Sequence, residues 1–180
     1  MDKLGLNINF SAVFGILVVV ALLRVIMAPF PNIEPIMLFT ITTALVLGPV
    51  SGFLFGFGSM IFSDLYLGLG IWSIYTSLTY GLIGILCGIF GILKRNWSRF
   101  ELTLLAFFMT LLYDIITATF WAFQTMQPLP LVYTLQIPFT FLHLSNCIFA
   151  FLFAPSLIRL SMRAKRFSVS RFMRRVFTYT

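Results

Sequence analysis

The chain has 180 residues, of which 60% belong to the apolar set and only 9% are charged, and its mean hydropathy is +1.03. Soluble domains carry about 25% charged residues, so this composition indicates an integral membrane protein. Six apolar spans of about 20 residues each would use about 120 positions. Only short connections and one tail would remain, which excludes a sizeable soluble domain.

The apolar runs are continuous over about 20 residues, whereas the strands of a membrane barrel alternate over about 10 residues. Helices are the expected spanning elements, because a helix satisfies its backbone hydrogen bonds within one segment. We predict an all-α integral membrane protein, a compact bundle of six transmembrane helices with both termini in the cytoplasm. Residues 1–158 form the six-helix domain in this prediction, and residues 159–180 form a basic cytoplasmic tail.

The expected spans cover residues 10–29, 36–47, 53–67, 72–93, 102–123 and 137–157, with a proline-containing linker over 124–136. The second span has about 12 residues, too few to cross a hydrocarbon core of about 30 Å at a rise of 1.5 Å per residue. Either the turn residues extend this helix, or the helix is broken or tilted. A further alternative is that the chain has five spans and one re-entrant segment. The first span has no small-residue cleavage site, so we do not expect a signal peptide.

Basic residues alternate cleanly along the chain. The connections after the first, third and fifth spans contain no Lys or Arg, and eleven of the twelve Lys and Arg residues fall on the other side: Lys3, Lys94, Arg95, Arg99, Arg159, Arg163, Lys165, Arg166, Arg171, Arg174 and Arg175. The positive-inside rule therefore places both termini in the cytoplasm. For the basic tail, attraction to anionic lipid is favoured over binding to nucleic acid.

Three charged side chains lie within the spans, namely Arg24, Asp64 and Asp114. Charges inside a membrane are costly, so each is a functional-site hypothesis. Arg24 has three interpretations: it snorkels, it pairs with Glu34 or Asp64, or it binds a ligand. Asp114, near mid-depth, needs a partner, and the candidates are His143, Thr117 and Tyr113.

Polar and aromatic groups from five of the six spans fall at outer or middle depth, which predicts an outward-open polar pocket. Aromatic rings with a few convergent donors and acceptors suit a small organic molecule. The predicted substrate-binding residues are Arg24, Asn32, Glu34, Asp64, Trp72, Thr76, Tyr80, Asp114, Trp121, His143 and Asn146. The alternatives are that the tryptophans anchor the chain at the membrane interface and that His143 is a packing residue.

Small residues form two kinds of pattern. Gly52-x-x-x-Gly56 and Gly84-x-x-x-Gly88 favour close helix packing within the chain, while Ser11-x-x-x-Gly15 is a small-residue face that could serve a partner.

One His, two Cys and five acidic residues provide little material for a metal site or a conventional active site. Cys87 and Cys147 lie inside apolar runs, where buried small hydrophobes are favoured over a disulfide. We therefore expect no enzyme activity, no metal and no cofactor.

Several stretches together resemble a known family: PNIEPIM (31–37), GPVSGFLFG (48–56), Ser63-Asp64, GLGIWS (68–73) and YGLIG (80–84). They resemble the substrate-specific (S) component of energy-coupling factor (ECF) transporters, which are ABC-type importers. The resemblance implies six helices with both ends inside, and capture of a vitamin or related micronutrient from the outer side. A cobalamin, pterin, flavin or pantothenate type of ligand would fit.

The resemblance also implies partners. An S component docks on a transmembrane coupling subunit bound to two ATPases, and its toppling in the membrane delivers the substrate inward. This chain has no Gly-Lys-Ser/Thr phosphate-binding loop, so ATP hydrolysis would belong to the partners. The family docks through an Ala-x-x-x-Ala face on the first span, and Ser11 and Gly15 keep its small-residue character.

Two other functions are open from the sequence. The rod-shape morphogenesis protein MreD is similar in size and architecture, and an MreD-like chain would act as a membrane scaffold of the cell-elongation machinery without a ligand. A membrane enzyme is the weakest alternative, because no nucleophile-base set is present. Asp64 and Asp114 could form a catalytic pair only if their two helices were adjacent.

Overall fold

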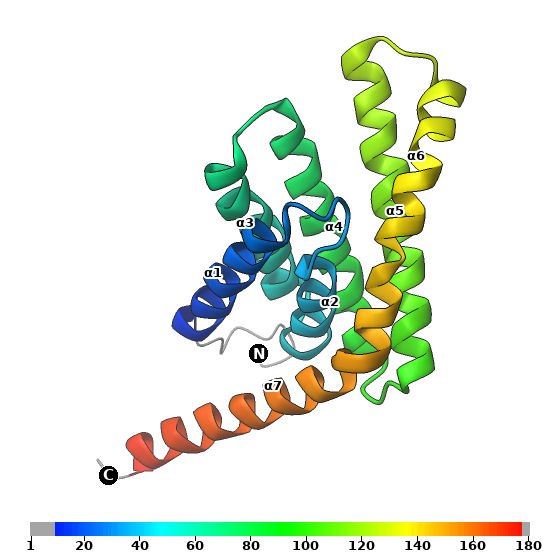
Figure 1. Ribbon diagram of the computed structural model, residues 1–180. Coiled ribbons are helices and arrows are strands. Elements are labelled where there is room, and N and C mark those ends of the chain that lie inside the picture. Colours follow the sequence, from blue (N-terminus) through cyan, green and yellow to red (C-terminus); the bar gives the residue numbers. More distant parts are fainter. Residues whose placement is uncertain (1–9, 178–180) are drawn as a thin grey trace.

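The computed structural model of the chain describes residues 10–177, with side chains described over residues 13–163. Over that backbone range it has no strand and seven α-helices: α1 (Phe10–Met27), α2 (Ile36–Leu47), α3 (Pro49–Leu67), α4 (Ile71–Leu93), α5 (Arg99–Thr125), α6 (Leu129–His143) and α7 (Ser145–Phe177) (Figure 1). The all-α membrane fold class is confirmed. Four helical stretches are long and apolar enough to cross a membrane, namely 49–67, 71–93, 99–125 and 129–163, while 13–27 and 36–47 are shorter apolar helices.

The connections sort the bundle into two ends (Figure 1). The α1–α2, α3–α4 and α5–α6 connections leave the upper ends of their helices, which we call the hairpin end. The start of α1 and the α2–α3 and α4–α5 connections lie at the lower end, which we call the basic end because it carries Lys94, Arg95 and Arg99. This alternation fits the charge pattern, although the cytoplasmic position of the termini stays a prediction.

Helix α2 occupies the centre of the bundle. It packs against α1, α3, α4, α5 and α7, and its buried residues are Ile36, Met37, Leu38, Thr40, Ile41, Thr42 and Ala44. Its 12 residues span about 18 Å, too short to cross the hydrocarbon core alone. Gly48, with φ +95°, then reverses the chain directly into α3. The second segment is therefore a short central helix that does not run on through the turn residues to position 50.

Glycines let α3 and α4 touch backbone to backbone. A Cβ atom built on Gly84 would lie 2.2 Å from the backbone of Gly52, and one on Gly88 would lie 2.4 Å from the backbone of Pro49. A Cβ on Gly56 would likewise lie 2.5 Å from the carbonyl oxygen of Tyr80. The two Gly-x-x-x-Gly patterns thus serve internal packing, as predicted.

Helix starts lie somewhat earlier than the apolar runs indicated. α3 begins at Pro49, because proline has no N–H to lose at the first helical position. α5 begins at Arg99, since Ser98 and Glu101 form a capping box in which the Ser98 hydroxyl accepts from Glu101 N and the Glu101 carboxylate accepts from Ser98 N.

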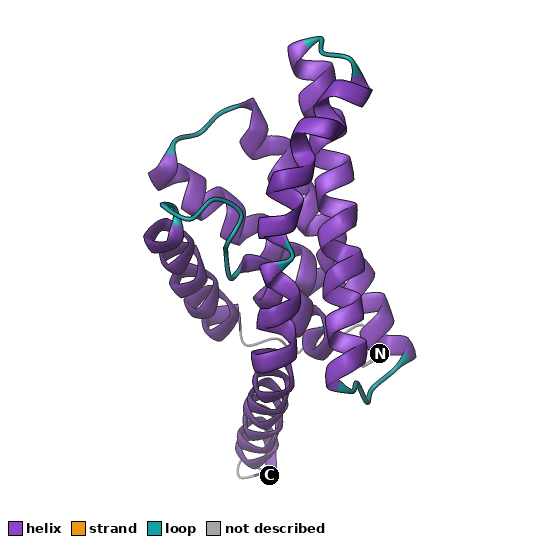
Figure 2. Ribbon diagram, turned by 45° about the vertical axis from the view of Figure 1, so that its right-hand side comes forward, coloured by secondary structure: helices purple, strands orange, loops and turns teal. Residues whose placement is uncertain are grey.

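The expected linker over 124–136 is wrong in most of its length. α5 continues to Thr125, Met126 closes it in a left-handed conformation (φ 55°), and α6 already begins at Leu129. Pro128 and Pro130 stand at the N-cap and in the first turn of α6, where proline starts a helix instead of ending one. The sixth span is therefore α6 followed by α7, with only Leu144 between them. Figure 2 shows the two helices following each other alongside α5.

Helix α7 continues to Phe177, so the chain stays helical through the position where the basic tail was expected to begin. Pro155 lies inside α7 and removes one backbone hydrogen bond, which bends a helix. The C-terminal part of α7 turns away from the direction of α6 and leaves the bundle (Figure 1).

Candidate functional site

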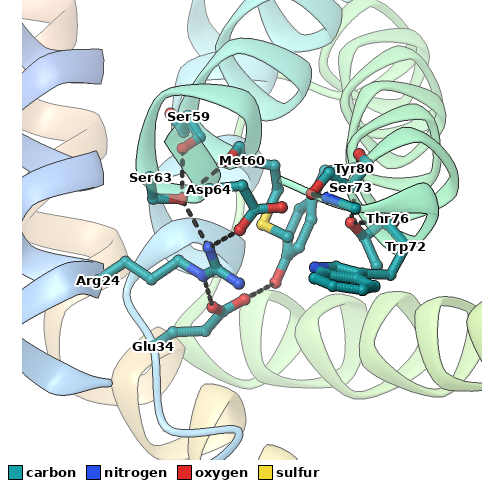
Figure 3. Close-up of polar contacts among 11 residues, drawn as sticks. Arg24, Glu34, Ser59, Met60, Ser63, Asp64, Trp72, Ser73, Thr76 and Tyr80 are labelled. Carbon is teal, nitrogen blue, oxygen red and sulfur yellow. Dashed lines mark hydrogen bonds and ion pairs between the residues drawn. The ribbon is translucent and has the colours of Figure 1, made fainter. Parts of the chain in front are cut away.

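A buried ion cluster holds the hairpin end of α1 to α3 and α4 (Figure 3). Arg24 donates from Nε to Glu34 Oε2 (2.6 Å), and from Nη1 to Ser63 Oγ (2.7 Å) and Asp64 Oδ1 (2.5 Å). The Tyr80 hydroxyl donates to the other oxygen of Glu34. We call these five residues the Arg24 cluster. Arg24 therefore pairs with both acids that the sequence offered as alternatives.

The cluster keeps unused hydrogen-bonding capacity. Asp64 Oδ2 is buried and has no hydrogen-bond partner among the described residues, and Arg24 bonds only through Nε and Nη1, which leaves Nη2 free of hydrogen bonds to them. The Arg24 side chain is 19% exposed. One cation faces two carboxyl groups, so a further donor could bind beside Asp64 without displacing Arg24.

The α1–α2 connection positions Glu34 over Arg24. Asn32 in this connection has φ 58°, a left-handed conformation that asparagine adopts more readily than most residues. Its Nδ2 atom donates to the carbonyl oxygen of Phe139 on α6 (3.1 Å), so the connection reaches across the bundle. Pro35 then leads directly into the buried start of α2.

A second cluster lies where α6 meets α7. The Nδ1 atom of His143 lies 2.7 Å from Asp114 Oδ1, and Asn146 Nδ2 donates to Thr110 Oγ1 (3.3 Å). The Tyr113 ring meets the imidazole edge-on at 5.2 Å between centroids. We call these five residues the His143 cluster. Of the partners considered for Asp114, His143 is the one that binds its carboxylate, because the Thr117 hydroxyl bonds to the backbone of its own helix instead.

Not every predicted site residue joins these clusters. Trp72 and Trp121 are about half exposed, and no hydrogen bond of either indole nitrogen to the described residues is present. The Thr76 hydroxyl bonds to the Trp72 carbonyl oxygen of its own helix (2.8 Å). The tryptophans are placed as interface anchors would be, and a role in ligand contact stays a prediction.

Three cluster members were absent from the predicted set: Ser63, Thr110 and Tyr113. Thr110 and Tyr113 precede Asp114 by four residues and one residue, and helical periodicity places the first of them on the same face as the carboxylate. Ser63 directly precedes Asp64, and this position next to a charged residue within a span was the sequence feature that could have indicated it.

A pocket of about 320 Å³ lies between α5 and the α6–α7 segment. Its wall includes Phe107, Leu111, Asp114 and Ile115 from α5, and it also includes Tyr133, Gln136, Ile137, Thr140, Phe141 and Leu144. Asp114 is the one predicted site residue on this wall. Of the other predicted residues, Arg24, Glu34, Asp64 and Tyr80 bond to one another in the Arg24 cluster, and a role of the predicted set in ligand binding stays a prediction.

The side chains described over 13–163 give little support to metal binding, a disulfide or catalysis. No group of three or more His, Cys, Asp and Glu that could hold a metal is present there. Cys87 is buried, Cys147 is half-buried, and both are free thiols. α3 and α5 do not contact each other, so Asp64 and Asp114 do not lie on adjacent helices, and the catalytic-pair hypothesis is wrong.

Apolar helices around two buried polar clusters define a multi-pass membrane protein, since ionisable groups inside a bilayer face the bundle interior and one another. The family model described as "ECF-type riboflavin transporter, S component" matches residues 7–160. The chain belongs to this family, and it is therefore an ECF transporter S component in the cell membrane and not an enzyme. No curated protein and no solved structure matches the chain.

Proposed function

We propose that this S component captures a vitamin or related micronutrient from the outer side of the membrane. It then delivers the substrate inward together with a transmembrane coupling subunit and two ATPase subunits. The name of the matching family makes riboflavin the first candidate substrate. No observation favours the scaffold role of an MreD-like protein.

The observation that carries this proposal is the Arg24 cluster. The cluster ties α1 to α3 and α4, but buried ion clusters contribute little net stability, so stability alone is a weak reason to hold Arg24, Glu34 and Asp64 together inside an apolar bundle. A binding protein gains a preorganised set of donors and acceptors. Asp64 Oδ2 has no hydrogen-bond partner among the described residues and can accept from a donor of the ligand, while Glu34 lies on the other side of Arg24.

The partner face is proposed on α1. This helix contacts only α2 and α3 among the described elements, and its opposite face leaves Val19, Leu22 and Ile26 more than half exposed. Gly15 has no atom within 4 Å of a built Cβ, so this face is open at the backbone. The side chain of Ser11, the other predicted docking residue, lies outside the described residues.

Riboflavin fluorescence provides the test, because a flavin ring entering an aromatic protein interior is quenched. The purified chain in detergent is titrated with riboflavin, and the Arg24→Gln variant is compared with Lys94→Gln, which removes a cation of the exposed Lys94–Glu101 pair at the opposite end. We expect saturable quenching by the wild type and by Lys94→Gln, and at least about tenfold weaker binding by Arg24→Gln.

Failure of riboflavin alone would not end the search for a substrate. Native mass spectrometry of protein purified from cells grown in rich medium would then identify any retained vitamin-sized ligand. A ligand-free mass, together with no thermal shift across a panel of vitamins, would contradict the capture function and move the interpretation toward a scaffold.

A further inference from the structure

The pocket between α5 and α6 differs in kind from the Arg24 cluster. Leu111, Ile115 and Ile137 give it apolar walls, and Ile115 and Ile137 are more than half exposed on the outside of the bundle. In a bilayer such side chains face the acyl chains, so a molecule would reach this pocket from the membrane. With a volume of about 320 Å³ it falls at the small end of ligand-binding pockets.

Asp114 makes the pocket electrostatically unusual. This residue is 4% exposed, and one oxygen of its carboxyl group, Oδ1, meets His143 Nδ1 at 2.7 Å. The other oxygen, Oδ2, is buried and has no partner among the described residues. His143 can donate the existing bond through Nδ1, which leaves Oδ2 as an acceptor without a donor among the described residues. An acceptor without a donor inside an apolar bundle is costly, so the site favours an occupant that carries a donor or a positive charge.

The remaining wall supports a cation. Phe107, Tyr133 and Phe141 place three aromatic rings on it, and none of the residues that line it is Lys or Arg. Aromatic faces attract organic cations through the ring quadrupole, and a carboxylate adds a full opposite charge. Gln136 and Thr140 offer further oxygen acceptors on the same wall. The Tyr133 hydroxyl is held by Thr119 Oγ1 (2.7 Å), which fixes one ring against α5.

The geometry points to a binding site for a small lipophilic amine between α5 and α6, with its ammonium group on Asp114 Oδ2 and its apolar body against the rings of Phe107, Tyr133 and Phe141. This site is separate from the Arg24 cluster, where Arg24 would repel a cation. An amine held here would also lie next to the junction of α6 and α7, because Leu144, the residue between these helices, is on the pocket wall.

The test compares two near-isosteric probes, 2-phenylethylamine, which is protonated at neutral pH, and 2-phenylethanol, which is neutral. Binding to the full chain in nanodiscs is followed by ligand-observed NMR and by the thermal unfolding midpoint. We expect the amine to bind at least about tenfold more tightly than the alcohol. Asp114→Asn should abolish this preference, whereas Glu101→Gln, which removes an exposed carboxylate at the basic end, should keep it.

A second variant guards against misfolding of Asp114→Asn. Phe141 is 71% exposed at the rim of the pocket, so Phe141→Leu should leave the fold intact and weaken amine binding about two- to tenfold through loss of the ring. Equal binding of amine and alcohol to the wild type, no binding of either, or an unchanged preference in Asp114→Asn would overturn the inference. Riboflavin titrations on the same samples separate the two proposals, since each can fail while the other holds.

Discussion

The rings of Tyr80 and Tyr113 lie 4.7 Å apart between centroids, and this contact joins the two buried polar clusters. Tyr80 donates its hydroxyl to Glu34 in one cluster, while Tyr113 meets His143 in the other. Side chains from α1 to α6 thus form one connected set of contacts across the bundle. A ligand that changed one cluster would have a packed aromatic contact through which to affect the other.

The first prediction concerns this contact. Tyr113→Ala should remove the partly buried ring that touches both Tyr80 and His143 and destabilise the protein by about 2–4 kcal/mol, somewhat below the cost of deleting a fully buried aromatic ring. Tyr113→Phe keeps the ring and should cost far less. Chemical denaturation in detergent, followed by tryptophan fluorescence, measures both values. Equal losses would show that the hydroxyl, and not the ring contact, matters.

Arg24 gives a second prediction. Arg24→Gln leaves the buried Asp64 and the partly buried Glu34 without their cation, and we expect a loss of up to about 3–5 kcal/mol. Adding Glu34→Gln and Asp64→Asn removes the uncompensated charges, so the triple variant should recover part of the loss. Thermal unfolding of the single and triple variants decides this. If the triple variant is no more stable than Arg24→Gln, charge compensation is not the role of Arg24.

The glycine contact between α3 and α4 predicts that no side chain larger than that of glycine is tolerated at Gly84 without loss of stability. Gly84→Ala would place its Cβ 2.2 Å from the Gly52 backbone, so the helices must separate, at a cost of about 1–3 kcal/mol. Gly15→Ala is the matched control, since a Cβ there meets no atom within 4 Å. Unfolding midpoints of the two variants should therefore differ clearly, with Gly15→Ala close to wild type.

Asn32 allows backbone strain to be separated from a hydrogen bond. Asn32→Gly loses the bond to the Phe139 carbonyl but accepts φ 58°, whereas Asn32→Ala loses the bond and also bears a left-handed conformation. The alanine variant should be less stable than the glycine variant by about 1 kcal/mol. Equal stabilities would mean that the α1–α2 connection relaxes freely when the bond is lost.

The orientation can be tested by labelling. In a background with both cysteines replaced by alanine, Leu69→Cys places a thiol in the α3–α4 connection at a position that is 57% exposed, and Asn96→Cys places one in the α4–α5 connection. A membrane-impermeant maleimide added to intact cells should label Leu69→Cys alone, with Asn96→Cys reacting only after permeabilisation. The reverse pattern would invert the bundle.

Much of the helix plan could be predicted because long apolar runs and strong breakers determine it. The segment 36–47 was predicted with its observed bounds, since Pro35 and Gly48-Pro49 limit it at both sides. The start of α6 was missed, because Pro128 and Pro130 look alike in sequence whether they end a loop or begin a helix. The single Leu144 between α6 and α7 carries no signal at all.

Seven residues of the predicted site set lie in the two polar clusters, whereas their contacts could not be predicted, and their role in binding stays a prediction. Arg24, Glu34, Asp64, Tyr80, Asp114, His143 and Asn146 are charged or polar in an apolar context, and the structure brings them into two clusters. What sequence could not reveal is pairing over long separations, such as His143 with Asp114, 29 residues away. The pocket between α5 and the α6–α7 segment could not be predicted, because its wall is mostly Phe, Leu and Ile, which are common everywhere in this chain.

The central position of α2 has a consequence for biogenesis. A 12-residue segment is too short for the insertion machinery to retain as an independent span. Its threonines lower its hydrophobicity and so reduce its tendency to insert further. Its neighbours α4 and α7 follow it in the chain and are therefore synthesised later. We therefore expect the segment to enter the bilayer together with α3 and to remain incompletely enclosed until α7 has been synthesised. Truncation before residue 145 should leave a chain that is inserted but degraded quickly.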